Sequence, residues 1–123
     1  MDNIVVKNSE IKVRVGLNAE QVPVKLEWMA EDNPEGAKWS EVKAMLFSIF
    51  DKDSRDTLKI DLWTDEMRVD EMNRFFYQAL RSMTDSYFRA TQNTEMANQM
   101  QSFVQYFGEE TKVLEKGENG QIG

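Results

Sequence analysis

The sequence predicts a small α+β protein with a three-stranded, mainly antiparallel sheet and helices packed on one of its faces. Three short segments alternate apolar and polar residues with the period of two that is typical of half-buried strands. Three longer segments repeat apolar residues at the spacing of an amphipathic helix. Because strands with a single apolar face need a cover on that face, the predicted order β-β-α-β-α-α indicates a sheet with helices on one side.

The first two predicted strands form a hairpin, and the third lies further along the chain. The first strand alternates apolar residues with Lys12 and Arg14, and a turn at 18–21 leads into the second, which alternates apolar residues with Lys25 and Glu27. The third strand follows a polar turn at 51–56 and points Leu58, Ile60 and Leu62 to the core. Its outward positions hold Lys59, Asp61 and Trp63.

Apolar spacing predicts three helices. The first covers about residues 37–50, with apolar side chains at Val42, Met45, Leu46, Ile49 and Phe50. The second covers about residues 69–90 and starts with acidic residues that suit the positive end of a helix dipole. Asn93 or Thr94 is expected to cap the third. We interpret the Met-rich stripes of the last two helices as core rather than as a binding groove.

Length and composition predict a single folded domain. A chain of 123 residues with 41% apolar residues has enough material for one core. We assign the domain to residues 9–108, with a flexible N-terminal arm at 1–8 and a disordered tail at 109–123. The sequence shows neither a secretory signal nor an apolar run of membrane-spanning length. We therefore expect a cytoplasmic protein without direct membrane insertion.

Charge and two missing residue types restrict the possible chemistry. The net charge of −7 argues against sequence-independent nucleic-acid binding, which needs clustered Lys and Arg. The chain has no Cys and no His. This composition excludes disulfides, thiolate metal sites, Cys nucleophiles and His-dependent relays. We expect no cofactor and no enzymatic activity.

Two acidic clusters are candidates for a metal or catalytic site. The turn at 51–56 resembles the start of a calcium-binding loop, but Arg55, Asp56 and Leu62 stand where a ligand, a glycine and a bidentate Glu are required. A second cluster surrounds the end of the third strand and the start of the next helix. Its carboxylates leave open a carboxylate-dependent enzyme or a metal-binding protein built on Asp61, Asp65 and Asp70, with Glu66 and Glu71 beside them.

The outer face of the predicted sheet is a candidate partner-binding surface. It collects basic residues from all three strands on a chain that is acidic overall, together with an exposed Trp of the kind that anchors interfaces. The open edges of a three-stranded sheet also invite a partner or a second copy to add a strand. The residues of the candidate surface are Trp63, Lys59, Asp61, Arg14, Lys12 and Lys25.

The stretch Leu58–Phe76 closely resembles the GldC family of gliding motility-associated proteins from Bacteroidetes. The resemblance is carried by Leu58–Thr64, Met67, Val69–Met72 and Phe75-Phe76. It is supported by Ser9–Lys12, Val22-Pro23, Trp28 and Arg89–Thr91. The resemblance implies a small accessory protein of surface gliding and of the associated type IX secretion system. It carries over no catalytic residue.

These observations favour a non-enzymatic cytoplasmic protein that binds another protein of the gliding or secretion apparatus. A homo-oligomer formed through a sheet edge or sheet face is compatible with the same features. Two alternatives remain open at this point. One is the carboxylate-dependent enzyme or metal binder, and the other is a chaperone-like protein that holds secretion clients on an exposed apolar groove.

Overall fold

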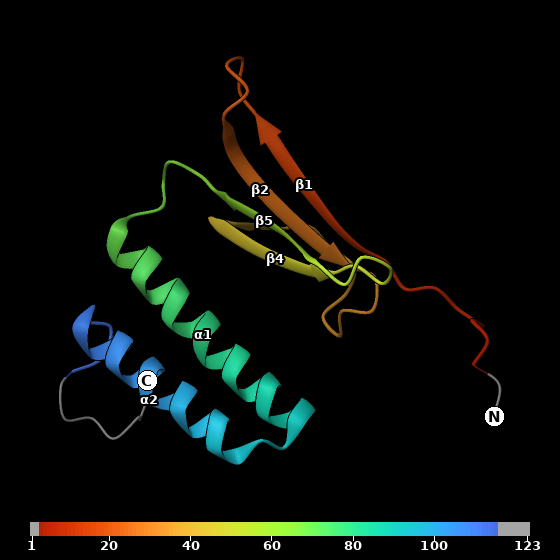
Figure 1. The fold of residues 1–123 in the computed structure, drawn as a ribbon. Helices are drawn as coiled ribbons and strands as arrows, with labels where there is room; N and C mark the ends of the chain where they lie inside the picture. The colour runs from red at the N-terminus through yellow and green to blue at the C-terminus, as the bar shows by residue number, and fades with distance from the viewer. Residues whose placement is uncertain (1–2, 116–123) are drawn as a thin grey trace. The chain divides into compact units, whose positions relative to one another are not determined.

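The computed structural model describes residues 3–115 and confirms the α+β class (Figure 1). The chain divides into two compact units, which are described separately: one extends to Met67 and the other starts at Arg68. The regular elements of residues 3–67 are strands, and those of residues 68–115 are helices. The elements are β1 (Ile11–Leu17), β2 (Pro23–Ala30), β3 (Ser40–Val42), β4 (Ala44–Phe50), β5 (Thr57–Trp63), α1 (Val69–Thr91) and α2 (Thr94–Glu110).

Strands β1, β2 and β3 form an antiparallel sheet in that order, and the predicted β1–β2 hairpin is confirmed. The side-chain oxygen of Asn18 anchors the turn by accepting the backbone N–H groups of Glu20 and Val22 at 2.9 and 3.1 Å. The register places Val15 opposite Leu26, which is fully buried, and Arg14 opposite Glu27 on the other face. The predicted alternation is therefore correct from Ile11 to Gly16, after which an irregularity in the register sets Leu17 opposite Pro23.

The predicted helix over residues 37–50 is wrong, because this segment forms strands β3 and β4. The apolar residues of Ala44–Phe50 suit both periods: they match helical spacing, but Met45, Phe47 and Ile49 also share one face of a strand. Pairing with β5 decides between the two, since the register aligns Phe47 with Ile60 over seven cross-strand pairs. The described residues of the first unit, 3–67, thus form five strands in two sheets rather than three strands in one.

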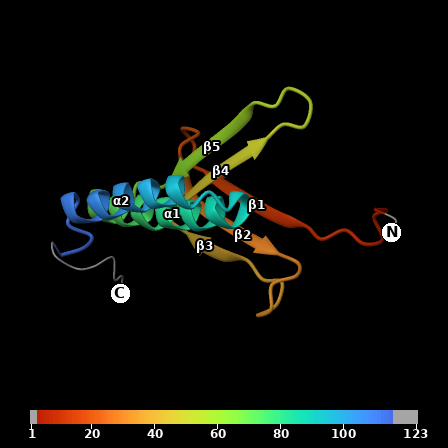
Figure 2. The ribbon, with the colours of Figure 1, turned by 60° about the horizontal axis from the view of Figure 1, so that its bottom comes forward.

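One bent segment supplies strands to both sheets. Strands β3 and β4 are separated only by Lys43, yet β3 pairs with β2 and β4 pairs with β5. The buried Thr64 secures the bend, because its N–H donates to the Lys43 carbonyl at 3.0 Å. As a result the β4–β5 hairpin runs at an angle to β1, β2 and β3 (Figure 2).

The second unit contains an antiparallel pair of helices, as the ribbon and its colour gradient show in Figure 1. The second and third predicted helices are confirmed. Gln92 ends α1 in the left-handed conformation, and Asn93 caps α2 by accepting the Met96 N–H at 3.0 Å. The buried core of this unit consists of Tyr77, Val104 and Leu114. Because Leu114 belongs to that core, the packed chain extends beyond the predicted boundary at Gly108, and the rest of the predicted tail, 116–123, lies outside the described residues.

Candidate interaction surfaces

Trp63 stands at the end of β5 with 55% of its surface exposed. It lies opposite Ala44 of β4, whose small side chain leaves the indole ring uncovered. Two residues of the same strand, Lys59 and Asp61, share its face, and their side chains form an ion pair with Nζ 2.7 Å from Oδ2. Phe50 lies on this face too and is 66% exposed. The β4–β5 hairpin therefore presents aromatic surface beside a charge pair.

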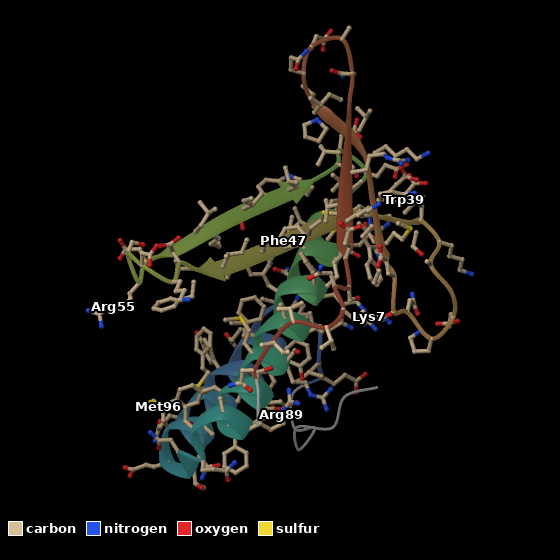
Figure 3. The ribbon with its side chains drawn as sticks, turned by 90° about the vertical axis from the view of Figure 1, so that its right-hand side faces the viewer. Lys7, Trp39, Phe47, Arg55, Arg89 and Met96 are labelled. Carbon is tan, nitrogen blue, oxygen red and sulfur yellow. The ribbon has the colours of Figure 1, made fainter. Side chains whose placement is uncertain are left out.

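The three other candidate residues lie on the three-stranded sheet, and each forms an ion pair with a glutamate. Arg14 and Lys25 reach the Glu27 carboxylate at 3.5 and 3.9 Å, and Lys12 lies 3.8 Å from Glu10. The Arg14 guanidinium also stacks over the Trp39 ring, 3.9 Å from its centroid; the ring lies beside this sheet in Figure 3. Much of the predicted positive charge is thus paired locally.

The predicted topology placed the six candidate residues on one sheet. In the structure they lie on two different sheets. Lys12, Arg14 and Lys25 belong to the three-stranded sheet, whereas Lys59, Asp61 and Trp63 belong to the two-stranded one. The error follows from the misassigned helix, which removed two strands from the predicted sheet. Because of the same error, Glu41 was not assigned to the sheet. It lies opposite Glu27 and adds negative charge beside the basic side chains.

The acidic cluster at the start of α1 serves the helix end. Arg68 pairs with Asp70 through two hydrogen bonds of 2.9 and 3.1 Å, and the Glu71 carboxylate accepts the Arg68 backbone N–H at 3.1 Å. The hydrogen bond from Arg68 lowers the pKa of Asp70, which is the opposite of what a general acid needs. Between residues 3 and 115, no group of three or more acidic side chains could hold a metal ion.

The Asp51 carboxylate organises the turn between β4 and β5. Its Oδ2 accepts the backbone N–H groups of Ser54 and Asp53 at 2.8 and 3.0 Å. Hydrogen bonds from the Ser54 backbone and hydroxyl, and then from the Asp53 backbone, lower the pKa of Asp51. This geometry is that of an Asx turn, so the carboxylate that resembled a first calcium ligand is occupied by backbone donors.

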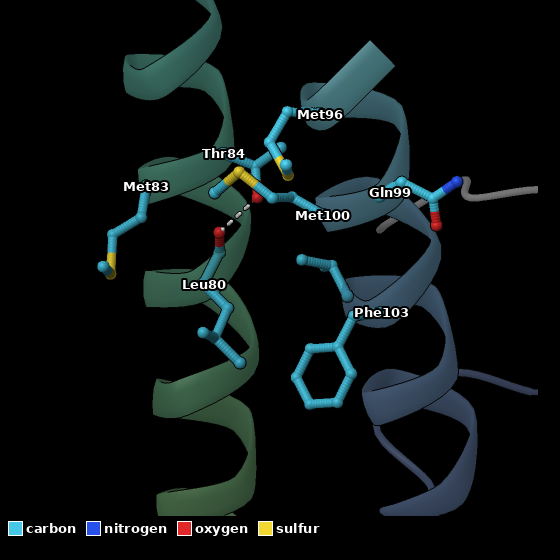
Figure 4. A pocket seen from close by; sticks show the side chains of 8 residues that line it. Leu80, Met83, Thr84, Met96, Gln99, Met100 and Phe103 are labelled. Atoms are coloured by element: carbon cyan, nitrogen blue, oxygen red, sulfur yellow. Dashed lines mark hydrogen bonds between the residues drawn. The ribbon is translucent and has the colours of Figure 1, made fainter.

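A groove between α1 and α2 is the surface that sequence reasoning missed (Figure 4). It has a volume of 360 Å³. Met96 and Met100 of α2 reach toward Thr84 of α1, whose hydroxyl donates to the Leu80 carbonyl at 2.9 Å. Three lining side chains remain about half or more exposed: Met83 at 60%, Phe103 at 52% and Met96 at 49%. The sequence signal was the Met-rich stripe, which we interpreted as core.

The groove carries no charged side chain; its polar members are Thr84 and Gln99. Within the described part of the chain, no helix is long and apolar enough to cross a membrane. The fold and these surfaces define a small α+β protein that exposes aromatic and apolar side chains on both of its units.

The chain belongs to the GldC-like family of gliding motility-associated proteins. The model of that family matches residues 23–113, which include most of both units. The match confirms the resemblance carried by Leu58–Phe76. No curated protein and no solved structure matches the chain.

Proposed function

We propose that this protein is a non-enzymatic accessory component of the gliding machinery that acts in the cytoplasm by binding a protein partner. Its family is associated with gliding motility, and the family resemblance also implies the type IX secretion system. A binding role agrees with a chain that lacks Cys and His and whose Asp70 carboxyl has a lowered rather than a raised pKa.

The observation that carries this proposal is the exposure of Trp63. A large aromatic ring that remains 55% exposed at a strand end keeps apolar area in water, which costs free energy unless a partner covers it. Trp is enriched among the residues that dominate binding energy in protein interfaces. The Lys59–Asp61 pair on the same face of β5 supplies one charge of each sign, which favours a partner with a complementary polar edge.

Replacement of Trp63 by Ala tests the proposal. We expect the variant to recover at least about tenfold less partner than the wild type in pull-downs from a gliding bacterium, because truncation of a central interface Trp commonly costs about 2 kcal/mol or more. Tyr106→Ala is the matched control, since Tyr106 is 59% exposed but lies on α2. Equal recovery by a folded Trp63→Ala variant would remove this surface from consideration.

A second pair of variants separates the two groups of candidate residues. Arg14→Glu alters the three-stranded sheet, and Phe50→Ala alters the face that Trp63 occupies. If the β4–β5 face binds alone, Phe50→Ala weakens recovery and Arg14→Glu does not. The reverse result would assign binding to the basic side chains of the three-stranded sheet, namely Lys12, Arg14 and Lys25.

The groove on the helical unit favours a second candidate, a chaperone-like protein that holds extended apolar segments of secretion clients. Flexible Met side chains without neighbouring charges suit varied apolar sequences. This role predicts that the protein suppresses aggregation of a chemically unfolded client. Met83→Glu, in the groove, should abolish suppression, whereas Ser82→Glu, also exposed but outside the groove lining, should not. Suppression that survives Met83→Glu would contradict the candidate.

A further inference from the structure

Strand β5 is hydrogen-bonded to one strand only among the described residues. Among residues 3–115 it pairs with β4 alone, so its other edge has no strand partner. An isolated two-stranded hairpin is marginally stable in water, and an open edge invites another strand. This hairpin also exposes apolar side chains on both faces: Ile49, Leu58 and Ile60 on one, and Phe50 and Trp63 on the other.

The open edge of β5 presents backbone groups from alternate residues. The Thr64 N–H donates to the Lys43 carbonyl at 3.0 Å, in register with the β4–β5 ladder. Because hydrogen-bonded pairs alternate along an antiparallel ladder, Leu58, Ile60 and Leu62 direct their backbone groups to β4. The odd-numbered residues therefore turn theirs outward, and these include Lys59 and Asp61.

The side chains of β5 are self-complementary about its central residue, Ile60. In an antiparallel pair centred there, Lys59 of each copy lies opposite Asp61 of the other, which gives two ion pairs related by the twofold axis. On the other face, Leu58 lies opposite Leu62, and Ile60 meets its own counterpart. Thr57 lies opposite Trp63. Every cross-strand position thus joins opposite charges, two apolar side chains, or Thr with an aromatic ring.

Neighbouring registers lose this complementarity. Centring the pair on Asp61 sets two carboxylates against each other, and centring it on Lys59 sets two ammonium groups against each other. The edge strand β1 differs in the same respect. A β1–β1 pair centred on Val13 would set Lys12 against Arg14, and one centred on Arg14 would set two guanidinium groups against each other. Such repulsion between like charges protects an edge strand from pairing.

From this register we propose that β5 pairs antiparallel with β5 of a second copy, centred on Ile60, to form a four-stranded sheet β4-β5-β5-β4. The dimer joins the apolar faces of two hairpins into one surface and closes the open edge of each. It also places two Trp63 side chains on one continuous face. This inference does not depend on the partner proposed above.

Charge reversal tests the register. Lys59→Glu and Asp61→Lys each set like charges against each other in a homodimer, so each variant alone should dimerise about tenfold or more weakly than the wild type. A mixture of the two variants restores both ion pairs, and only the heterodimer should form. Analytical ultracentrifugation of the separate and mixed proteins measures this. An effect confined to the Lys59–Asp61 pair within one chain would not be rescued by mixing, and that outcome would overturn the proposal.

Cysteine cross-linking gives an independent test, because the chain has no Cys of its own. Ile60→Cys places two thiols in a non-hydrogen-bonded pair, where Cα atoms lie about 4.5 Å apart, within reach of a disulfide. Leu58→Cys is the matched control, since its two copies would be separated by four positions, roughly 13 Å. We expect a disulfide-linked dimer from Ile60→Cys at least about tenfold faster than from Leu58→Cys. Equal rates, or a wild type that stays monomeric at hundreds of micromolar, would overturn the proposal.

The two proposals fail separately. Phe50→Ala alters the face that Trp63 occupies but lies on β4 and changes no residue of β5, so it should reduce partner recovery without lowering the dimer fraction. If Lys59→Glu loses the dimer but recovers the partner normally, the β5 edge serves self-association and is not needed for partner binding.

Discussion

Gly108 shows how closely the two helices pack. A Cβ at this position would lie 2.6 Å from a ring carbon of Tyr77 and 2.8 Å from Cδ1 of Leu114, and both side chains belong to the buried core. No heavy atoms approach so closely without a shift of the chain. The position is buried within α2, where glycine is otherwise unfavourable, so its presence is explained by the approach of Tyr77.

Gly108→Ala should lower the free energy of unfolding by about 1–3 kcal/mol, because the added methyl group overpacks the Tyr77–Leu114 contact. Urea denaturation followed by circular dichroism measures the change. Ser102→Ala, at an exposed position of the same helix, is the control and should stay within about 0.5 kcal/mol of the wild type. A stabilised Gly108→Ala protein would contradict the packing described for this unit.

At the scale of single elements, the β4–β5 turn combines side-chain hydrogen bonds to its backbone with one residue of positive φ. Asp51 accepts backbone N–H groups within the turn, and Arg55 adopts a left-handed conformation with φ of 60°. Arg55 lies at the tip of the hairpin with its side chain pointing away from the strands (Figure 3). A residue with a Cβ pays a steric cost there that glycine does not.

Arg55→Gly should therefore raise the free energy of unfolding by about 0.5–1 kcal/mol, the steric relief exceeding the entropy lost by glycine. Thermal unfolding compared with Lys52→Gly checks the prediction. Lys52 is not among the residues of positive φ, so glycine there should destabilise the turn. If both variants shift stability in the same direction, backbone strain at Arg55 does not contribute significantly to the free energy of unfolding.

The segment Ala44–Phe50 shows where element prediction fails. Its apolar residues lie on both faces of the strand, so neither the period of two nor that of 3.6 is distinctive. In contrast, α1 has a single assignment from the sequence, because Val69–Thr91 keeps helical spacing over a length that no strand reaches. The choice for Ala44–Phe50 depends on β5, a partner that the local sequence does not contain.

At the scale of the whole molecule, the division into two units bears on the predicted single domain of residues 9–108. The strands and the helices belong to different compact units, yet the family match extends through both. All three Trp residues lie in the strand unit, and both helices lie in the other. Tryptophan fluorescence and the helical circular dichroism signal therefore report on different units.

If residues 9–108 form one domain, the two signals should follow a single unfolding transition in urea with the same midpoint and the same m value. Both curves should be measured at one protein concentration, because self-association through β5 would make stability concentration-dependent. Two transitions with separate midpoints would show that the units unfold independently and that the predicted domain should be divided after Met67.

The sequence by itself determined the α+β class, the alternation of side chains along the predicted strands and both long helices, because these depend on periodicities within one segment. The prediction that Leu58 and Ile60 point to the core is wrong, since they are 59% and 42% exposed. It also pointed to Trp63, Lys59 and Asp61 as one group, since alternation along a single strand places them together. Only the tertiary structure decided that Ala44–Phe50 is a strand, that Glu41 joins the basic residues, and that the six candidate residues lie in two sheets. Those outcomes depend on cross-strand partners that are distant in sequence. The residue pattern within one segment does not specify which other strand that segment will pair with.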